Sequence, residues 1–340
     1  MKKKTITLIG GSGFLAKYCI SELLKEGHNL KIVCRNPHLA GHLRMMAPIE
    51  QLDIVKGNIM LKHTIEPYIK NSDVVINFVG VLNDSSGGQS FENCHSLGPK
   101  NIADLSAKYK VEKFIHFSSI GADIESDSKY QQSKGLGELN IQKSYPNTII
   151  IRPSIVFGPG DGFFSVQAKL LKSLPVVPLF ANNKYQCVYV KDIATAINRL
   201  ILDDKYNGKI FEFGGPEKMS LKEIYQLILD TLKIKRLIVP VPLSFANFIA
   251  FMMLPLPSPL ITFDQVKLLR KDNVISKTEF NLEKLGIEPS SPRSIISTYI
   301  SLFKRNKSKL SIQVLFDKLQ MVSSNYFLPN STIYLLISMQ

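Results

Sequence analysis

The chain has 340 residues, of which 45% are hydrophobic and 21% are charged, and its formal net charge is +14. This length predicts roughly two domains with a full hydrophobic core, and the composition excludes a disordered or collagen-like chain. The positive charge would attract nucleic acid, anionic lipid or an acidic protein. The sequence contains no helix-turn-helix, zinc-finger or RNP pattern, so we expect no nucleic-acid partner.

Four cysteines, at positions 19, 34, 94 and 187, are far apart and form no Cys-x-x-Cys motif. They predict a reduced, cytoplasmic protein rather than a disulfide framework. The histidines show no metal-ligand spacing, which predicts that there is no metal site. The N-terminus, MKKKTITLIGGSG, is basic and then apolar, but its apolar run is short and passes directly into glycines. It predicts the first strand of a domain and no signal peptide.

The start of the chain predicts a strand over residues 5–9, a helix over about residues 14–25 and a second strand over residues 30–34. The turn between the first strand and the helix reads GGSGFLA. Glycines let the chain turn tightly and let backbone N–H groups approach a pyrophosphate, and the helix N-terminus adds the positive end of its dipole. We expect a dinucleotide-binding loop; the alternative is a structural turn without a ligand.

The end of the second strand indicates which dinucleotide is bound. An acidic residue there would accept hydrogen bonds from the adenosine ribose and repel a 2′-phosphate. This chain instead has Arg35 and Asn36. Because a guanidinium can pair bidentately with a phosphate, we expect NADP(H) in preference to NAD(H). The alternative is that Arg35 is a solvated arginine at a strand end.

Strand and helix patterns continue to alternate along the chain. We expect strands within residues 74–82, 113–122 and 147–162, and a helix over residues 101–111. This alternation predicts an α/β fold, a Rossmann-type doubly wound parallel sheet with helices on both faces. Ligands of such sheets bind beyond the carboxyl ends of the strands. Glycine and polar residues collect at these ends, namely residues 10–13, Arg35, Gly80, Ser118, Ser119 and residues 152–154.

The segment SKYQQSK, residues 128–134, places Tyr130 and Lys134 four residues apart. On a helix, both side chains would lie on one face, one turn apart. A phenol beside an ammonium can be an acid/base pair, or it can belong to a solvated helix surface. Tyr109 and Lys113 have the same spacing, so the spacing alone does not identify a site.

Several motifs together resemble the short-chain dehydrogenase/reductase superfamily in its extended or atypical branch. They are GGSGFLA (10–16), GNI (57–59), NFVG (77–80), FSS (117–119) and YQQSKGLGE (130–138). A second group resembles the dehydrogenase-like accessory subunit of respiratory complex I, the NADH:ubiquinone oxidoreductase, and its bacterial relatives. This group includes RPSIVFGPGDGFF (152–164), VYVKDIATAI (188–197) and FEFGGPEKMSLKEI (211–224). The resemblance runs in order from about residue 3 to residue 303.

The resemblance implies a set of cofactor-binding residues. The pyrophosphate would lie on residues 10–15, and Arg35 would face the 2′-phosphate. Asn58 and Ile59 would flank the adenine, with an asparagine where the superfamily usually has an aspartate. The full set is Gly10, Gly11, Ser12, Gly13, Phe14, Leu15, Arg35, Asn36, Asn58, Ile59, Val79, Gly80, Tyr130, Lys134, Pro153 and Val156.

The nicotinamide half of the cofactor would contact residues later in the chain. By the resemblance, Val79 and Gly80 would line the ribose. Pro153 and Val156 would approach the nicotinamide.

Ser119, Tyr130 and Lys134 fall on the catalytic triad of the superfamily, with Ser118 as the second choice for the serine. Tyr130 would exchange a proton with a substrate oxygen, Lys134 would lower the pKa of Tyr130 and bind the nicotinamide ribose, and Ser119 would hydrogen-bond the substrate. The loop from Ser119 to Tyr130 is shorter than in the extended enzymes. Tyr130 and Lys134 would also hold the cofactor, so catalysis and cofactor clamping both stay open.

Residues 243–254 form an apolar run between Pro242 and Pro255. As a helix the run would span about 18 Å, too short for the ~30 Å hydrocarbon core, so we expect no transmembrane helix. It could lie in a membrane interface or against a partner subunit, and the alternative is a buried helix under the cofactor cleft. The expected location is the cytoplasm, peripheral on the inner face of the cytoplasmic membrane.

We expect a dinucleotide-binding Rossmann core over residues 1–158. A smaller α/β substrate-side region, interleaved with the core, would follow over residues 159–305. Residues 306–340 match no part of the family pattern, and we expect a poorly ordered tail there.

Three functions compete. The first is an NADP(H)-binding accessory subunit, or assembly or stability factor, of a respiratory NADH:quinone oxidoreductase, with complex I subunits and a membrane surface as partners. The second is an active NAD(P)H-dependent reductase, dehydrogenase or epimerase that acts on a small or quinone-related substrate through Ser119, Tyr130 and Lys134. The third is a scaffold without cofactor. The sequence favours the first and names no substrate.

Overall fold

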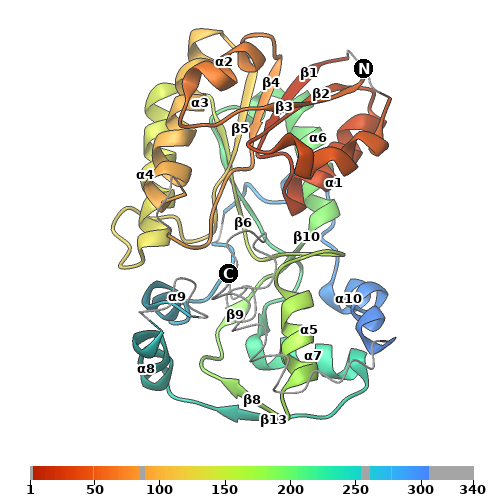
Figure 1. Cartoon of the computed structure of the whole chain (residues 1–340), viewed down its shortest axis with the longest axis vertical. Coiled ribbons are helices and arrows are strands. Elements are labelled where there is room, and N and C mark those ends of the chain that lie inside the picture. Colours follow the sequence, from red (N-terminus) through yellow and green to blue (C-terminus); the bar gives the residue numbers. More distant parts are fainter. Residues whose placement is uncertain (1–2, 49, 85–88, 254–260, 277, 306–340) are drawn as a thin grey trace. The chain divides into compact units, whose positions relative to one another are not determined.

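The computed structural model describes residues 3–48, 50–84, 89–253, 261–276 and 278–305 (Figure 1). The chain divides into two compact units. Unit 1 comprises residues 1–156, 186–218 and 273–290, and unit 2 comprises residues 157–185, 219–272 and 291–340. The expected tail over residues 306–340 and Pro255 lie outside the described residues, and the domain boundaries given above stay a prediction.

Unit 1 is built on a seven-stranded sheet in the order β11-β6-β5-β4-β1-β2-β3. Its neighbouring strands pair in parallel over the described residues. The order reverses between β1 and β4, which is the switch point where doubly wound sheets bind their ligands. The predicted Rossmann-type fold is therefore confirmed. The strands are β1 (Thr5–Ile9), β2 (Asn29–Cys34), β3 (Leu52–Lys56), β4 (Val74–Asn77), β5 (Lys113–Phe117), β6 (Ile149–Pro153) and β11 (Ile210–Phe213).

The central strands are apolar on both faces, as strands covered by helices on both sides must be. In β4, Val74 and Ile76 pack into one hydrophobic cluster and Val75 packs into another. All three side chains are fully buried. Burial of an aliphatic side chain of this size stabilises the folded state by about 1.5–3 kcal/mol. Because side chains alternate along β4, both faces of the strand gain this stabilisation only when helices cover both.

Helices cover both faces of the sheet of unit 1 (Figure 1). One face carries α1 (Phe14–Lys25) and α6 (Val190–Leu202), which pack against each other. The other face carries α2 (Lys62–Lys70), α3 (Gly98–Lys108) and α4 (Lys129–Ser144). The remaining elements are η1 (Pro37–Met46), the π-helical segment η2 (Glu92–Leu97), η3 (Asp204–Tyr206) and the short strands β7 (Val156–Phe157) and β10 (Val188–Tyr189).

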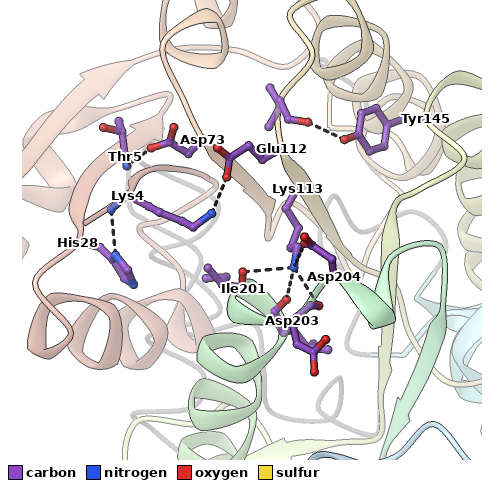
Figure 2. Close-up of polar contacts among 12 residues, drawn as sticks. Lys4, Thr5, His28, Asp73, Glu112, Lys113, Tyr145, Ile201, Asp203 and Asp204 are labelled. Carbon is purple, nitrogen blue, oxygen red and sulfur yellow. Dashed lines mark hydrogen bonds and ion pairs between the residues drawn. The ribbon is translucent and has the colours of Figure 1, made fainter. Parts of the chain in front are cut away.

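Lys113 is a buried cation at the start of β5 (Figure 2). Its ammonium donates hydrogen bonds to the main-chain oxygens of Leu200, Ile201 and Asp203 at 2.8, 3.2 and 3.0 Å. It also lies 3.1 Å from the Asp204 carboxylate. The carbonyl groups that end a helix have no partner within the helix, so Lys113 caps the C-terminus of α6. Its spacing from Tyr109 therefore reflects no shared helix face.

Unit 2 is smaller and mixes helices with two-stranded ribbons. Asp161 ties its segments together, because its carboxylate accepts hydrogen bonds from the Ser165 amide at 2.8 Å and the Tyr299 hydroxyl at 2.6 Å. Helices α5, α7 and α10 pack together, β8 pairs with β13 in parallel, and β9 pairs with β12 antiparallel. The elements are α5 (Phe164–Ser173), β8 (Val176–Leu179), β9 (Lys184–Tyr185), β12 (Met219–Ser220), α7 (Leu221–Leu232), β13 (Leu237–Pro240), α8 (Leu243–Met252), α9 (Phe263–Leu268), η4 (Glu283–Leu285, in unit 1), α10 (Pro292–Ile300) and η5 (Ser301–Arg305).

The apolar run expected at residues 243–254 forms α8 over Leu243–Met252. Ala246 and Ala250 are its buried residues, whereas Phe248 and Phe251 are 57% and 60% exposed. Helix α8 is therefore not fully buried, and the alternative of a helix under the cofactor cleft stays a prediction. Within the part of the chain that the structure describes, no helix is both long and apolar enough to cross a bilayer.

Candidate functional site

The loop between β1 and α1 lies at the switch point of the sheet. Gly10 has φ +78°, and a Cβ atom there would lie 2.9 Å from Val79 Cγ2, so only glycine suits this position. Gly13 is the N-cap of α1, and it has no side chain that could accept a hydrogen bond from the first turn of the helix. The first N–H groups of α1 thus meet no capping side chain among the described residues, which suits an anion such as a pyrophosphate. The residues predicted to hold the pyrophosphate, Gly10, Gly11, Ser12, Gly13, Phe14 and Leu15, form this turn and the start of α1, and their contact with the ligand stays a prediction.

Arg35 and Asn36 follow β2 and are exposed, as a side chain that binds a 2′-phosphate must be. The Arg35 guanidinium donates a hydrogen bond to Gln89 Oε1 at 3.3 Å. This distance is long for a hydrogen bond, and an arginine offers five N–H donors in total. The guanidinium therefore retains donors for a phosphate while it contacts Gln89.

Asn58 and Ile59, expected at the adenine, follow β3. Ile59 is buried in the hydrophobic cluster on the α2 and α3 face. Asn58 Oδ1 accepts a hydrogen bond from the Met60 amide at 3.0 Å. The side-chain oxygen that we expected to face the adenine therefore also holds its own turn, which weakens it as a ligand acceptor.

Ser119, Tyr130 and Lys134 come together although they belong to two elements. Both serines of the FSS motif follow β5, and Tyr130 and Lys134 lie on the first turns of α4. The Lys134 ammonium lies 6.0 Å from the centre of the Tyr130 ring. The Ser118 hydroxyl is buried and has no hydrogen-bond partner among the described residues, whereas the buried Ser119 hydroxyl lies near the Tyr130 phenol. A buried hydroxyl without a partner is available to a ligand.

The ionisation of Tyr130 and Lys134 is set mainly by burial. Burial raises the pKa of Tyr130, and the nearby Ser119 hydroxyl opposes that rise. Burial lowers the pKa of Lys134 to about 8, although Glu138 opposes the change. In this structure burial outweighs any lowering of the Tyr130 pKa, and the electrostatic effect expected from Lys134 stays a prediction. Tyr130 is a protonated phenol at neutral pH, able to donate a hydrogen bond and a poor base.

The residues expected at the nicotinamide half follow β4, end β6 and begin β7. A Cβ atom on Gly80 would lie 3.2 Å from Lys134 Nζ, so the exposed backbone of Gly80 borders this ammonium. Pro153 and Val156 are partly exposed, and the Pro153 carbonyl accepts a hydrogen bond from the Ile120 amide. The structure thereby joins the end of β6 to the segment that follows Ser119.

Sequence reasoning placed Arg152 at the ligand edge of the sheet but missed its partners, and it missed His95. Arg152 binds Glu138 of α4 through Nε at 2.9 Å and Nη2 at 2.6 Å, and also lies 3.7 Å from Glu212. This bidentate pair joins α4 to β6. His95 of η2 has its ring 5.3 Å from the Tyr130 ring. The available signal for Arg152 was a charge directly after the apolar run at residues 149–151, whereas the polar segment around His95 gives no such signal.

Cysteine pairing and metal binding are the next features of the described residues. Cys19, Cys34, Cys94 and Cys187 are buried and form no disulfide with any described residue. Within the described ranges, no three His, Cys, Asp or Glu side chains gather so as to hold a metal ion.

Comparisons with known proteins agree with this geometry. Residues 6–214 match the profile of the NAD dependent epimerase/dehydratase family. The chain is 28% identical over 303 residues to the NADH-ubiquinone oxidoreductase 40 kDa subunit, mitochondrial, of Neurospora crassa, with 89% of this chain and 80% of that protein covered. It is 31% identical over 289 residues to NADH dehydrogenase (ubiquinone) 1 alpha subcomplex subunit 9, mitochondrial, of Mus musculus, with 84% and 76% covered.

Solved structures share the fold. The UDP-glucose 4-epimerase of Thermus thermophilus, determined as a complex with NAD, superposes with a TM-score of 0.65 at 20% identity. The match covers 88% of this chain and 99% of the epimerase.

Proposed function

The chain belongs to the NAD dependent epimerase/dehydratase family, and from this premise we propose that it is an NADP(H)-binding accessory subunit of a respiratory NADH:quinone oxidoreductase. The similarity to two complex I subunits over more than four-fifths of the chain is the observation that carries this proposal. The alignments extend well beyond residues 6–214 and so include segments of unit 2.

The dinucleotide would lie along the switch point of the sheet in unit 1. The glycine loop and the N-terminus of α1 would hold the pyrophosphate, with the positive end of the helix dipole facing it. Gly80, Tyr130 and Lys134 would surround the nicotinamide ribose. A ligand held at 100 times its dissociation constant stabilises the folded state by about 2.7 kcal/mol, so a bound nucleotide can serve stability without turnover.

The preference for NADP(H) rests on the end of β2. Arg35 is exposed there with donors to spare, and no acidic side chain closes the strand. A 2′-phosphate would form charge-assisted hydrogen bonds with the guanidinium, whereas a ribose hydroxyl would find no carboxylate.

The partner surface would be the α8 region of unit 2. Phe245, Phe248 and Phe251 are each more than half exposed on a helix that contains no charged residue. Helix α9, which packs against α8, is followed by the exposed cations Arg270 and Lys271. Exposed aromatic rings beside cations are typical of a helix that lies in the interface of an anionic bilayer. The protein would accordingly lie peripherally on the inner face of the cytoplasmic membrane, next to the complex.

The test is purification without added nucleotide, followed by mass spectrometry of the released ligand and analysis of co-purifying proteins. We expect retained NADP(H) and subunits of the membrane-bound oxidoreductase. Preparations that hold no dinucleotide and do not respond to added NADP(H) in thermal melts would refute the cofactor role. For the accessory role, membranes are solubilised in mild detergent and this chain is captured from the extract. Absence of the complex from the captured material would refute that role.

A second candidate is an active reductase, dehydrogenase or epimerase on a small or quinone-related substrate. The buried Ser119 hydroxyl near the protonated Tyr130 favours it, because together they could bind and protonate a substrate oxygen. A screen of quinones and short carbonyl compounds with NADPH would separate the two candidates.

A further inference from the structure

His95 is a buried imidazole between the end of β4 and the first turns of α4. It is 1% exposed and belongs to η2, a π-helical segment that runs directly into α3. Such segments recur at functional sites. The main chain of His95 touches α4, because a Cβ atom on Gly137 would lie only 1.9 Å from the His95 carbonyl oxygen. Gly137 therefore permits a close approach that fixes η2 against α4.

The hydrogen bonds of His95 determine its tautomer. The Val81 amide, which can only donate, lies 3.0 Å from His95 Nε2, so Nε2 is an unprotonated acceptor. His95 Nδ1 lies 2.9 Å from Ser133 Oγ, and the Ser133 hydroxyl donates to the Tyr130 carbonyl at 2.8 Å. Nδ1 therefore carries the ring proton and donates a hydrogen bond to Ser133 Oγ. One directional chain of three hydrogen bonds joins Val81 to the backbone of Tyr130.

The imidazole is also neutral. Burial and the nearby Lys134 ammonium hold the pKa of His95 far below its usual value. A neutral ring whose two nitrogens are both engaged neither supplies nor takes up a proton near pH 7. Its contribution is geometric.

The rings around His95 fix the orientation of the Tyr130 phenol. Phe91 stacks on His95 at a centroid distance of 5.3 Å and an interplanar angle of 17°. Tyr130 meets both rings edge to face, at 5.3 Å from His95 and 5.7 Å from Phe91. Stacked and edge-to-face arrangements of this kind stabilise the relative orientation of the rings beyond the effect of their burial.

We propose that His95 is the positioning residue that sets the Tyr130 phenol and the Gly80 and Val81 backbone at the distance required by the nicotinamide half of the dinucleotide. The inference rests on the proposed function. A Cβ atom on Gly80 would lie 3.2 Å from Lys134 Nζ and 3.8 Å from His95 Nε2, so a shift of His95 would move the loop that borders the clamp lysine. The adenosine end, on residues 10–15 and Arg35, has no contact with His95 in this network.

The experiment compares a whole dinucleotide with its adenosine fragment. NADP⁺ and 2′,5′-ADP, with NAD⁺ and AMP in parallel, are titrated calorimetrically into the full chain and its variants. His95→Phe keeps an aromatic ring but removes both hydrogen bonds, and His95→Gln retains an acceptor for Val81. His28→Phe is the matched control: His28 is also fully buried, and its Nδ1 accepts from the Lys4 amide near the start of the sheet (Figure 2).

We expect His95→Phe to lower the affinity for the dinucleotide roughly tenfold, as loss of about 1.4 kcal/mol requires, and to leave fragment binding within about twofold. His95→Gln should recover part of the loss, and His28→Phe should lower the melting temperature without this selectivity. Equal losses for dinucleotide and fragment, or no loss, would overturn the inference while the proposed function stands. Wild-type protein that binds none of the four ligands would refute both.

Ser133→Ala provides a second route should His95→Phe not fold. It removes the acceptor of the Nδ1 proton without touching the ring. The same selective loss, smaller in size, is expected. Unchanged dinucleotide affinity in Ser133→Ala together with a normal melting temperature would count against the inference.

Discussion

The Lys134 ammonium lies 3.4 Å from the main-chain oxygen of Phe117, at the carboxyl end of β5. The side chain is 4% exposed, and its pKa is lowered to about 8. A lysine whose pKa is lower in the folded state destabilises that state while both states are protonated. This cost is fully present below pH 8 and is relieved as the pH rises towards the unfolded value of about 10.4, because the unfolded chain then binds more protons.

Lys134→Met should therefore have opposite effects with and without ligand. Without nucleotide, we expect the variant to melt at the same or a higher temperature than the wild type at pH 7, and its stability should rise less between pH 8 and pH 10. With NADP(H), the variant should lose most of the thermal shift, because the nicotinamide ribose loses the ammonium that would hold it. Melting curves at several pH values, with and without nucleotide, measure both effects. A large destabilisation of the ligand-free variant at pH 7 would contradict this account.

Arg35→Asp tests the choice of nucleotide. The change removes charge-assisted hydrogen bonds to a 2′-phosphate and adds a repelling carboxylate. We expect NADP(H) affinity to fall about 10–100-fold, in line with the 1.5–3 kcal/mol of a hydrogen bond to a charged group, and NAD(H) affinity to change little. Arg44, another exposed arginine of unit 1, supplies the control variant Arg44→Asp. Equal losses for the two nucleotides in a titration would show that Arg35 does not read the phosphate.

Tyr130→Phe distinguishes a cofactor-binding role of the site from a catalytic role. The change removes the phenolic proton but keeps the ring that packs against His95 and Phe91. The melting temperature should therefore stay close to that of the wild type, and dinucleotide affinity should fall less than in His95→Phe, because the ring packing and the Gly80 and Val81 backbone stay in place. Any turnover should fall ~10²–10⁴-fold, the usual contribution of general acid/base help. A Tyr130→Phe variant that retains a measurable wild-type activity would remove this residue from the chemistry.

Lys113→Met tests the cap of α6. Three main-chain oxygens and the Asp204 carboxylate surround the buried ammonium, and the apolar replacement leaves the carbonyls unpaired. We expect a loss of about 2–3 kcal/mol in the free energy of unfolding in urea. Lys4, whose ion pair with Glu112 is more exposed, gives the control (Figure 2). Lys4→Met should cost at most about 1 kcal/mol. Similar losses for the two variants would mean that burial of Lys113 carries no special stabilisation.

The sequence predicted the first strand, the glycine loop and the first helix at their observed positions, because each depends on local apolar runs and glycines. Strands β3 and β11 were not expected. In β3, the exposed Asp53 interrupts a short apolar run at the edge of the sheet. Their place depends on pairing with β2 and β6, which no local pattern records.

The site was predictable only in part for the same physical reason. Tyr130 and Lys134 share one helix, so their spacing and motif placed them correctly. The role of His95 depends on Val81 and Ser133, which are 14 and 38 residues away in the chain. Side-chain partners at such separations are chosen by the fold. The identical spacing of Tyr109 and Lys113 shows how little a spacing determines on its own, since Lys113 begins a strand.

The last prediction concerns the exposed rings of α8. A double change, Phe248→Ser with Phe251→Ser, removes two large apolar side chains that are 57% and 60% exposed. If these rings enter a bilayer interface, each contributes about 1.5–3 kcal/mol, so binding to vesicles that contain anionic phospholipid should fall at least 100-fold. Lys271→Glu should weaken binding to anionic vesicles by a smaller factor, because only one cation among several is lost.

Vesicle flotation with phosphatidylglycerol–phosphatidylcholine mixtures and with phosphatidylcholine alone measures this. Met45→Ser, at a residue of unit 1 that is 87% exposed, is the control for loss of an exposed apolar side chain and should leave flotation unchanged. The melting temperature of the double variant should match the wild type, because Ala246 and Ala250 carry the packing of α8. Flotation that the phenylalanine changes leave intact would exclude α8 from the membrane contact. A concentration-dependent dimer that the same changes dissolve would instead make α8 an interface between two copies of this chain.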